Sequence, residues 1–468
     1  MTIARHLLVL SLAVTTVSSA QTLRPDQTAF RALYKELVET NTTLSAGSCT
    51  LAAAQLATRL KSAGFTDADL TPFAIPEKPK EGGLVAILQG SDPKARPILL
   101  LAHIDVVEAK REDWTRDPFT LVEEDGYFYA RGASDDKAQA AIFTDILIRM
   151  KESGGKPRRT VKLALTCGEE TNGAFNGAEY LAANKRELID AAFALNEGGG
   201  GRLTPDSKPN MLALQVGEKT SQNYTLETTN RGGHSSMPRP DNAIYSLVGA
   251  LAKIRDYVFP VVLTPTTSAF FTKMSTVEKD PVAAAMAAIV LSPGDTGAAA
   301  LLSKDPTLNS TLRTTCVTTL LDAGHAENAL PQRARANVNC RIIPGETIEG
   351  TRLALERLVG DSAVKIAAKA ARGPLAKAPP LDPAVVGPAE KLAAKYFPGI
   401  PMVPVQSTGA SDAIFLAAAG IPTYGVPGIF YDADGGGIHG LNERIRVKSV
   451  YDGRDYLFEL VKTYANAR

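Results

Sequence analysis

Strand-like and helix-like segments alternate along this chain up to residue 197, and this alternation constrains the fold more than any other feature. The apolar runs 97–102, 161–166 and 191–195 have the length and composition of buried central strands. Helical periodicity is found over 27–40, 51–63, 138–151 and 176–184. Strands that alternate with helices form a largely parallel sheet with helices on its faces, so the pattern predicts an α/β fold.

A different pattern begins near residue 221. Strand-like runs at 223–229, 313–320 and 334–342 are separated by helices, which is typical of an α+β sandwich and predicts an inserted domain. A stretch rich in Ala, Lys and Pro, 367–383, is expected to lead back to the first domain, where a helix over 385–396 follows. The 468 residues are thus divided into a main domain in two parts, 21–218 and 376–468, and an inserted domain at 219–375.

The N-terminus has the layout of a secretory signal peptide. Arg5 precedes an apolar run at 7–17, and small residues then lead to Ala20, after which cleavage is expected. A membrane anchor is the alternative, but the run is shorter than the roughly 20 apolar residues that span a bilayer. The protein is therefore expected to be secreted or periplasmic after loss of residues 1–20, with no membrane partner.

Charge and cysteine content exclude some classes of function. The chain has 51 Lys and Arg against 50 Asp and Glu, which leaves no basic field for nucleic acid and favours a small-molecule partner. Its four cysteines are too few and too scattered for a disulfide scaffold or a cysteine-type zinc site. Cys316 and Cys340 lie on two strand-like runs that could pair as a hairpin, so a disulfide between them is conceivable in an exported protein.

Acidic residues and histidines lie where the predicted strands end or in the loops that follow. Ligands of open α/β sheets bind at this edge, beyond the carboxyl ends of the strands. Glu169 and Glu170 lie in the segment Cys167-Gly168-Glu169-Glu170 that comes immediately after the apolar run 161–166, and two adjacent carboxylates there repel each other unless a cation or a solvated cleft receives them. The residues of this edge are His103, Asp105, Asp135, Asp136, Glu169, Glu170 and Glu197.

Each motif also has a structural interpretation of its own, since His103 could be a satisfied core histidine and Asp135 and Asp136 could cap a helix.

The histidine and the acids at this edge, taken together, favour a metal site instead. Imidazole and carboxylate ligands in combination suit zinc, or cobalt or manganese. Two such cations about 3.5 to 4 Å apart activate a bridging water. A carboxylate beside that water can take its proton and pass it to a leaving amine, so the set favours a hydrolytic metal centre.

The sequence motifs and their order along the chain resemble family 20 of the metallopeptidases. This family includes aminoacylase, glutamate carboxypeptidase, carnosinase and carboxypeptidase S. Glu197 in place of Asp is more similar to aminoacylase and carboxypeptidase S than to the glutamate carboxypeptidases, and the enlarged stretch 264–310 resembles the carboxypeptidase S group, which is the most similar in overall pattern. The matching segments are His103-Ile104-Asp105, Gly132 to Lys137, Gly168-Glu169-Glu170, Gly232 to Ser236, Asn328 to Pro331, Gly409 to Asp412 and His439 to Glu443.

The resemblance implies the fold of the di-zinc exopeptidases, in which the inserted domain serves as a lid or for dimerisation. It implies two zinc ions, with cobalt or manganese as substitutes. Glu169 is the implied general base, Asp105 the residue that orients His103, and the peptide between Asp135 and Asp136 is implied to be cis. The implied metal ligands are His103 and Glu197 for one zinc, Glu170 and His439 for the other, and Asp135 between them.

The resemblance also assigns residues of the inserted domain. His234 is implied to stabilise the tetrahedral oxyanion, often across a dimer interface, although by itself it would be read as a turn residue. Asn328 and Arg341 resemble substrate-side polar groups, and Arg341 would bind a free carboxylate bidentately. Gly409 and Ser411 are expected to line the carboxylate subsite. His325 matches no role in the family and is interpreted as a loop residue.

The predicted function is hydrolysis of an amide bond next to a free carboxylate by a metal-activated water, as in a carboxypeptidase or dipeptidase. Hydrolysis of N-acyl amino acids, as by aminoacylase, is the alternative within this chemistry. A metal-binding protein without activity and a structural exported protein are the alternatives of another class. The implied partners are a small peptide or an N-acyl amino acid and, in one interpretation, a second copy of the chain bound through the inserted domain.

Overall fold

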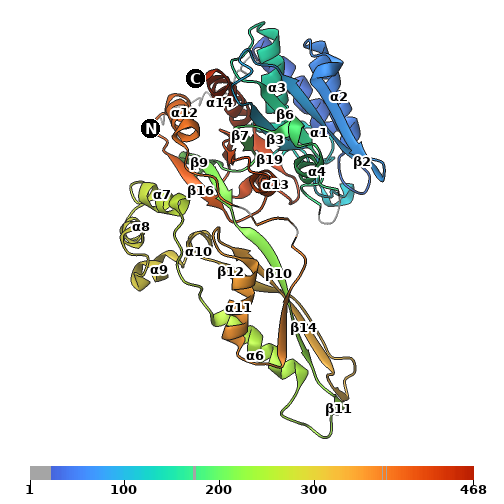
Figure 1. The fold of residues 1–468 in the computed structure, drawn as a ribbon, viewed down its shortest axis with the longest axis vertical. Helices are drawn as coiled ribbons and strands as arrows, with labels where there is room; N and C mark the ends of the chain where they lie inside the picture. The colour runs from blue at the N-terminus through green and yellow to red at the C-terminus, as the bar shows by residue number, and fades with distance from the viewer. Residues whose placement is uncertain (1–22, 172–174, 372, 376) are drawn as a thin grey trace, which may run out of the picture.

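The computed structural model describes residues 23–171, 175–371, 373–375 and 377–468. A ten-stranded sheet with helices on both faces forms the larger part, and a four-stranded sheet extends from it as an elongated second part (Figure 1). The predicted signal peptide, 1–20, lies outside the described residues. Among the residues that are described, no helix combines the length and the apolar character that a membrane crossing requires.

The large sheet has the strand order β1-β2-β6-β3-β7-β17-β9-β8-β18, and β16 pairs with β9. Its centre is parallel, because β3 runs parallel to both β6 and β7 and β7 runs parallel to β17, whereas β2 is antiparallel to β6. The prediction of a largely parallel mixed sheet is thus confirmed. The strands are β1 (Leu70–Ile75), β2 (Lys78–Leu88), β3 (Ile98–His103), β6 (Val161–Thr166), β7 (Phe193–Asn196), β8 (Gly200–Leu203), β9 (Pro209–Glu218), β16 (Met402–Ser407), β17 (Thr423–Gly425) and β18 (Phe430–Tyr431).

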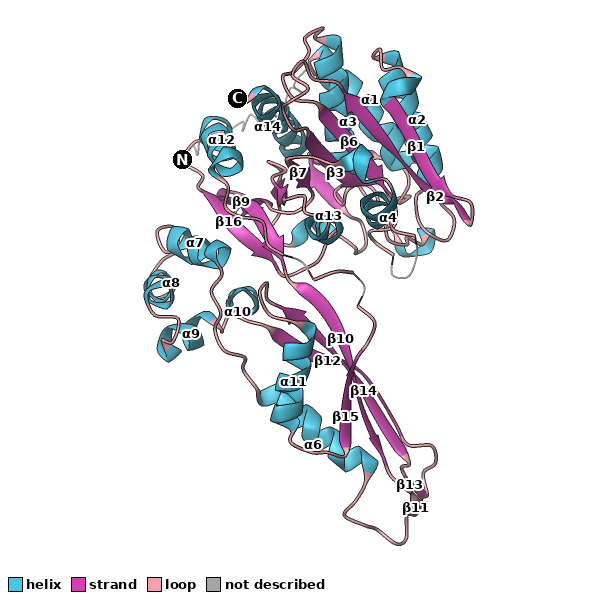
Figure 2. Ribbon diagram, viewed as in Figure 1, coloured by secondary structure: helices cyan, strands magenta, loops and turns pink. Residues whose placement is uncertain are grey.

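Helices cover both faces of this sheet (Figure 2). Because side chains alternate along a strand, Leu100 of β3 packs into one core and Leu99 and Leu101 pack into the other. Continuous apolar runs such as 98–102 therefore mark strands that are buried on both sides. One face carries α1 (Pro25–Glu39), α2 (Cys49–Ser62), α3 (Lys137–Glu152), α12 (Pro383–Tyr396) and α14 (Val447–Asn466), and the other carries α4 (Gly177–Asn184), α5 (Arg186–Ile189) and α13 (Ala413–Ala418).

The chain leaves the large sheet after β9 and forms a four-stranded antiparallel sheet of order β12-β14-β10-β15. In β10, Tyr224 and Leu226 are buried against the helices of this part, whereas Asn223 and Thr225 lie on the other face and are partly exposed. The predicted α+β sandwich is confirmed. Its elements are β10 (Thr220–Thr229), β12 (Thr315–Ala323), β14 (Arg333–Ile342), β15 (Val364–Ala368), α6 (Ala243–Asp256) and α11 (Ile348–Val359).

The Ala-rich stretch between α6 and β12 forms four short helices. They pack not on the four-stranded sheet but on the large one, where Phe271 and Met286 share a core with Met211 of β9 and Val403 of β16. This segment therefore lies beside β9 and β16, close to the point where the chain passes from one sheet to the other (Figure 1). The helices are α7 (Pro265–Met274), α8 (Val282–Leu291), α9 (Thr296–Leu302) and α10 (Pro306–Leu312).

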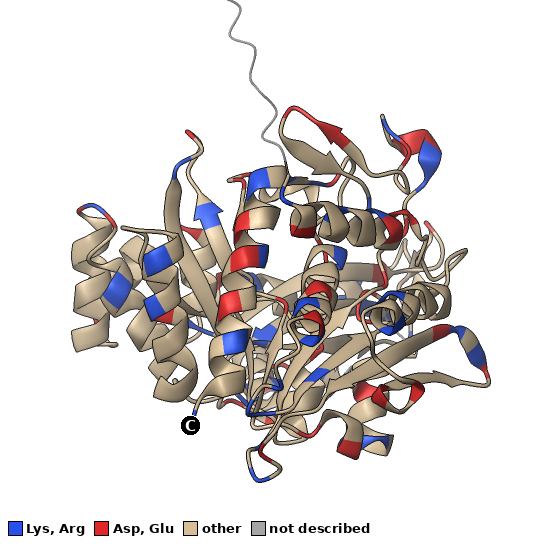
Figure 3. Ribbon diagram, turned by 90° about the horizontal axis from the view of Figure 1, so that it is seen from above, with Lys and Arg blue, Asp and Glu red and all other residues tan. Residues whose placement is uncertain are grey.

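Short elements complete the fold. A three-stranded sheet is made of two short strands that precede α3 and one that precedes α14, and a two-stranded pair lies at the far tip of the second part (Figure 1). Positive and negative side chains are interspersed over the described chain (Figure 3). The short elements are β4 (Val122–Glu124), β5 (Tyr127–Tyr129), β19 (Arg444–Arg446), β11 (Gly233–His234), β13 (Ala329–Leu330), η1 (Asp67–Asp69), η2 (Arg111–Asp113) and η3 (Gly435–Gly437).

All four cysteines form disulfides. Cys316 and Cys340 lie directly opposite each other on β12 and β14, so the conceivable bridge between these strands is present. Cys49 is bonded to Cys167 across 118 residues of sequence, and the sequence does not predict this bridge. Packing of α2 on the sheet brings Cys49 to the loop after β6, where Cys167 lies.

Candidate metal centre

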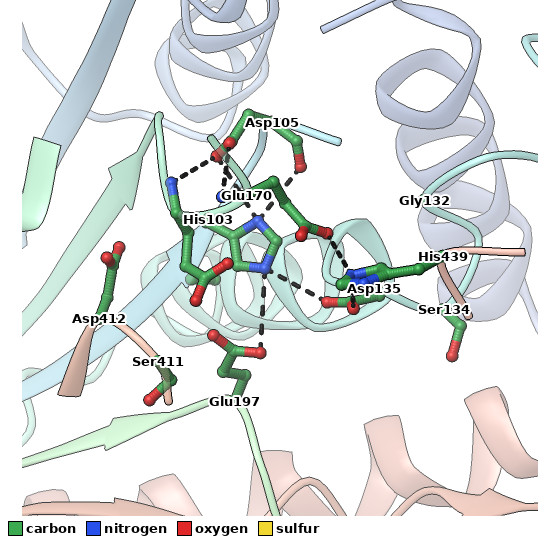
Figure 4. Close-up of polar contacts among 12 residues, drawn as sticks. His103, Asp105, Gly132, Ser134, Asp135, Glu170, Glu197, Ser411, Asp412 and His439 are labelled. Carbon is green, nitrogen blue, oxygen red and sulfur yellow. Dashed lines mark hydrogen bonds and ion pairs between the residues drawn. The ribbon is translucent and has the colours of Figure 1, made fainter. Parts of the chain in front are cut away.

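The predicted metal ligands converge at the carboxyl ends of the parallel strands (Figure 4). His103 is the last residue of β3, Glu170 follows β6 and Glu197 follows β7. Asp135 stands in the turn before α3, and His439 comes from the loop after η3. Segments from across the chain therefore place two imidazoles and three carboxylates in one cluster.

Asp135 lies between the two histidines. Its Oδ1 is 3.3 Å from His103 Nε2, and its Oδ2 is 3.1 Å from His439 Nε2. His439 Nε2 is also 2.9 Å from Glu170 Oε1, and His103 Nε2 is 3.9 Å from Glu197 Oε2. Each histidine thus has its own terminal carboxylate, and the two oxygens of Asp135 face opposite ways. This is the arrangement expected of a carboxylate that bridges two cations.

The donor set fits divalent cations. Ligand atoms of His103, Glu169 and Glu197 lie within 4.8 Å of one another, and so do those of His103, Asp135 and Glu170. Oε1 of Glu197 is buried and has no hydrogen-bond partner among the described residues. Buried carboxylate oxygens are normally hydrogen-bonded or coordinate a metal, so this oxygen is suited to coordinate a cation. Mixed imidazole and carboxylate donors suit zinc, cobalt or manganese.

The side chains of the cluster hold protons more tightly than usual unless a cation binds. Burial raises the pKa of Glu169 to about 9 and raises that of Glu197 as well, and neighbouring carboxylates add to both shifts. Hydrogen bonds to Asp135 and Glu170 raise the pKa of His439 to about 10. Without cations the cluster therefore retains protons on several groups. A metal would displace these protons, so we expect its binding to be pH-dependent.

Asp105 contacts both His103 and the acidic loop. Nδ1 of His103 lies 3.1 Å from the backbone carbonyl oxygen of Asp105 and 3.6 Å from its carboxylate. The carboxylate accepts the backbone N–H groups of Glu169 at 3.4 Å and of Glu170 at 3.1 Å. Asp105 is thus placed to orient the imidazole and to hold the loop after β6. The Asp135–Asp136 peptide is cis, as the resemblance implies.

Ser411 and Gly409 differ in burial and in the hydrogen bonds that they make. Ser411 Oγ donates to Glu218 Oε2 at 2.8 Å and accepts from the amide of Asn196, the residue before Glu197. Its backbone N–H also donates to Glu218. Gly409 lies in an exposed turn, where its N–H donates to Ser407 Oγ. The structure thus brings Ser411, but not Gly409, into the network behind the predicted ligands.

Three acidic residues of this region are missed by the sequence analysis. Glu443 accepts hydrogen bonds from the turn that contains Asp135. Asp412 accepts from Thr166 and Asn176, and burial raises its pKa to about 6. Glu218 binds Ser411, as described above. Glu443 and Asp412 stand within the segments that resemble the family, and this position could have marked them as site residues. Membership of a motif does not show, however, which atoms a side chain contacts.

The residues predicted for the inserted domain fall into two places. His234 lies in β11, at the tip farthest from the large sheet (Figure 1), and Ser235 N–H donates to the backbone oxygen of Asn328 beside it. Arg341 lies at the opposite end of the small sheet, opposite Ser221 at the start of β10. Within one chain the structure therefore does not bring His234 or Asn328 to the metal cluster. His325 lies in an exposed bend between β12 and β13, in line with its interpretation as a loop residue.

Residues 99–463 match Peptidase family M20/M25/M40. The chain belongs to this family. It is 30% identical over 402 residues to the human N-fatty-acyl-amino acid synthase/hydrolase PM20D1, covering 84% of this chain and 79% of the relative. It is 28% identical over 397 residues to the probable carboxypeptidase S-like 2 of Dictyostelium discoideum, covering 81% and 74%. These similarities confirm the resemblance to the carboxypeptidase S group.

Solved structures of the M20 family share this fold. The M20 family metallo-carboxypeptidase Sso-CP2 from Sulfolobus solfataricus superposes with a TM-score of 0.69 at 19% identity, and the match covers 95% of this chain and 100% of that chain. Together with the family match and the curated relatives, this makes the chain a metal-dependent peptidase or amidohydrolase of the M20 family. Its cluster of His103, Asp135 and His439 stands at the sheet edge where such α/β folds bind ligands.

Proposed function

We propose that this M20 hydrolase is an exported di-zinc enzyme that cleaves an amide bond next to a free carboxylate, acting as a carboxypeptidase or dipeptidase. The observation that carries the proposal is the position of Asp135 between His103 and His439, with one oxygen toward each. In this proposal His103 and Glu197 hold one cation, His439 and Glu170 hold the other, and Asp135 bridges them. Cobalt or manganese can occupy the same donors.

Glu169 is the general base of the proposed reaction. When bound, the cations lower the pKa of water and polarise the scissile carbonyl group. Glu169 lies in the loop after β6 and has a ligand atom within 4.8 Å of those of His103 and Glu197, so its carboxylate lies beside the cation site. A nearby cation favours the ionised form of Glu169, which opposes the effect of its burial. The carboxylate then takes a proton from water and delivers it to the leaving amine.

We propose that the inserted domains of two chains take part in binding each substrate molecule. Arg341 binds the free carboxylate of the substrate, and Ser411 and Gly409 line the same subsite. His234 and Asn328 lie at the distal tip of their own chain, so they serve the metal centre of a partner, where His234 stabilises the oxyanion. The edge strand β12 exposes Val317, Leu320 and Leu321 by 60%, 66% and 60%, which supports pairing with a second copy.

An N-acyl amino acid is the second candidate substrate. The specific observation in its favour is the 30% identity to a relative named as an N-fatty-acyl-amino acid synthase/hydrolase, over 84% of this chain. Both substrate classes present an amide bond beside a free carboxylate, so the same metal centre and the same Arg341 serve either one. The difference lies in the group that occupies the acyl side of the bond.

A hydrolysis panel tests the function. Purified protein with added zinc is incubated with dipeptides, longer peptides and N-acyl amino acids, each also as its C-terminal amide, with and without a chelator. We expect turnover of free-carboxylate substrates alone, and its loss with chelator. Turnover of the dipeptides or of the longer peptides identifies the first candidate, and turnover of the N-acyl amino acids alone identifies the second. If zinc binds and no free-carboxylate substrate is cleaved, or if no zinc binds, the protein is not the proposed enzyme.

Export is proposed from the N-terminal segment, whose apolar run and small residues lead to Ala20. The destination in this proposal is the periplasm or the exterior of the cell. Expression of the full chain in a bacterial host, followed by fractionation and N-terminal sequencing, tests it. A mature protein that begins at Gln21 in the exported fraction is expected. Full-length protein that stays in the cytoplasm would contradict the proposal.

A further inference from the structure

Arg131 and Glu443 join the two loops that carry Asp135 and His439. Arg131 begins the turn that contains Asp135, and Glu443 ends the loop that contains His439. Both side chains are buried, with 3% and 1% of their surface exposed. Each reaches from its own loop to the other, so the pair forms a reciprocal connection between segments more than three hundred positions apart in sequence.

The carboxylate of Glu443 accepts hydrogen bonds from the turn that contains Asp135. Its Oε1 accepts the backbone N–H groups of Ser134 at 2.8 Å and of Asp135 at 3.1 Å. Its Oε2 accepts the N–H of Gly132 at 3.0 Å and Nη1 of Arg131 at 2.7 Å. Four donors from one short turn thus converge on a single carboxylate. The donors include the backbone of the residue that lies between the two histidines (Figure 4).

The guanidinium of Arg131 makes the return contact. Its Nη2 donates to the backbone oxygen of Gly440 at 2.7 Å, and Gly440 follows His439 directly. The guanidinium also lies over the ring of Trp114, with 5.0 Å between Cζ and the ring centroid. Arg131 therefore restrains the loop of His439, while Glu443 restrains the turn of Asp135.

We propose that Arg131 and Glu443 are positioning residues of the metal centre, which fix the carboxylate of Asp135 against the imidazole of His439. The proposal rests on the proposed function, because it assumes that these two groups bind a cation. Contacts behind the ligands set ligand orientation, and their loss typically lowers metal affinity about 10- to 100-fold. Loss of one partner destabilises the fold at any buried ion pair, so the orientation of the ligands, and not stability, is the property that should distinguish this pair from others.

The variant Glu443→Gln tests the proposal. Its amide keeps the size of the side chain but replaces one acceptor oxygen with a donor NH2 group. Whichever way the amide is oriented, that group faces either the N–H groups of Ser134 and Asp135 or those of Gly132 and Arg131. The turn must then move. We expect zinc affinity at the site of His439 to fall about 10- to 100-fold, while the site of His103 is affected less.

Asp145→Asn is the matched control. Asp145 of α3 is 4% exposed and accepts two hydrogen bonds, at 2.9 and 3.2 Å, from Arg454, which is 0% exposed. This variant also removes the charge of a buried carboxylate paired with an arginine, but its partner does not contact a loop of the metal centre. We expect it to lower thermal stability and to leave metal binding unchanged.

The measurements are zinc content against buffered free zinc and the absorption spectrum of the cobalt-substituted protein. We expect that only Glu443→Gln lowers the affinity for one of the two metal ions and alters the cobalt spectrum, whereas Asp145→Asn does neither. Metal binding and a spectrum equal to those of Asp145→Asn would overturn the proposal. A wild-type protein that binds no metal would instead overturn the proposed function. If Glu443→Gln does not fold, Arg131→Lys is compared in its place, since it keeps the Glu443 carboxylate and loses the fork that also reaches Gly440.

Discussion

Cys49 and Cys167 are joined by a disulfide that links the first residue of α2 to the loop carrying Glu169 and Glu170. The loop begins where β6 ends, and the backbone oxygen of Cys167 also accepts the N–H of Gly177 near the start of α4. A helix on one face of the sheet is thereby bonded to the segment that supplies the proposed base and one proposed ligand. The bond therefore restrains the metal centre as well as the fold.

We predict that Cys49→Ala/Cys167→Ala lowers both stability and turnover. Loss of a disulfide that closes a long loop typically lowers the free energy of unfolding by about 2 to 4 kcal/mol. Because small displacements of catalytic groups are costly, we also expect kcat/KM to fall at least about tenfold. Denaturant unfolding and steady-state hydrolysis measure the two effects.

Cys316→Ala/Cys340→Ala is the control for this prediction. This pair joins β12 to β14 in the inserted domain and closes a loop of only 24 residues. We expect a smaller loss of stability and little change in kcat/KM. Equal losses of kcat/KM in the two double variants would show that the bond at Cys167 has no particular effect on the metal centre.

The alternation of strands and helices was sufficient to predict the large sheet, because its central strands are buried on both sides and thus continuously apolar. The strand 161–166 was predicted residue for residue, and β3 was predicted to within one residue. The chemistry was visible for the same reason. A histidine at the end of such a strand or a pair of acids in the loop after it, as at His103 or Glu169, contrasts sharply with the apolar residues before it.

The features that the sequence did not predict depend on contacts between distant segments. The bond between Cys49 and Cys167 and the contact of Glu443 with the Asp135 turn form only when helices and loops pack on the sheet. Likewise, no local pattern shows that His234 lies at the tip of the inserted sheet, far from His103. Residue type predicted the chemistry here, but not which part of the molecule supplies it.

Glu169→Gln is predicted to abolish most turnover and to keep the metal. The amide cannot accept a proton from water, and a positioned general base contributes typically about 10²- to 10⁴-fold to the rate. We expect kcat to fall in that range while zinc content stays at the wild-type value. Glu179→Gln, which changes an exposed acid in α4, serves as the control and should match the wild type. Full activity of Glu169→Gln would rule out the proposed mechanism.

His234→Ala is predicted to fold normally and to slow the chemical step about 10²- to 10³-fold, the usual effect of losing one oxyanion donor. If the partner supplies His234, mixing this variant with Glu169→Gln restores activity, because each mixed dimer has one complete site. Random exchange then gives about a quarter of the wild-type activity. Subunit exchange is verified with differently tagged chains. Exchange without recovery would show that the site is not shared between chains.

Glu218→Gln is predicted to flatten the dependence of stability on pH. Burial raises the pKa of Glu218 to about 7 from a model-peptide value of 4.5, so the folded protein holds a proton that the unfolded chain releases. Stability from this group is therefore present at low pH and is lost as pH rises from about 4.5 to 7, by about 3 kcal/mol in total. Gln resembles the protonated side chain and can still bond to Ser411. Denaturant unfolding at fixed free zinc should find the variant equal to the wild type at pH 4.5 and more stable at pH 8. The same difference at both pH values would mean that Glu218 does not titrate in this range.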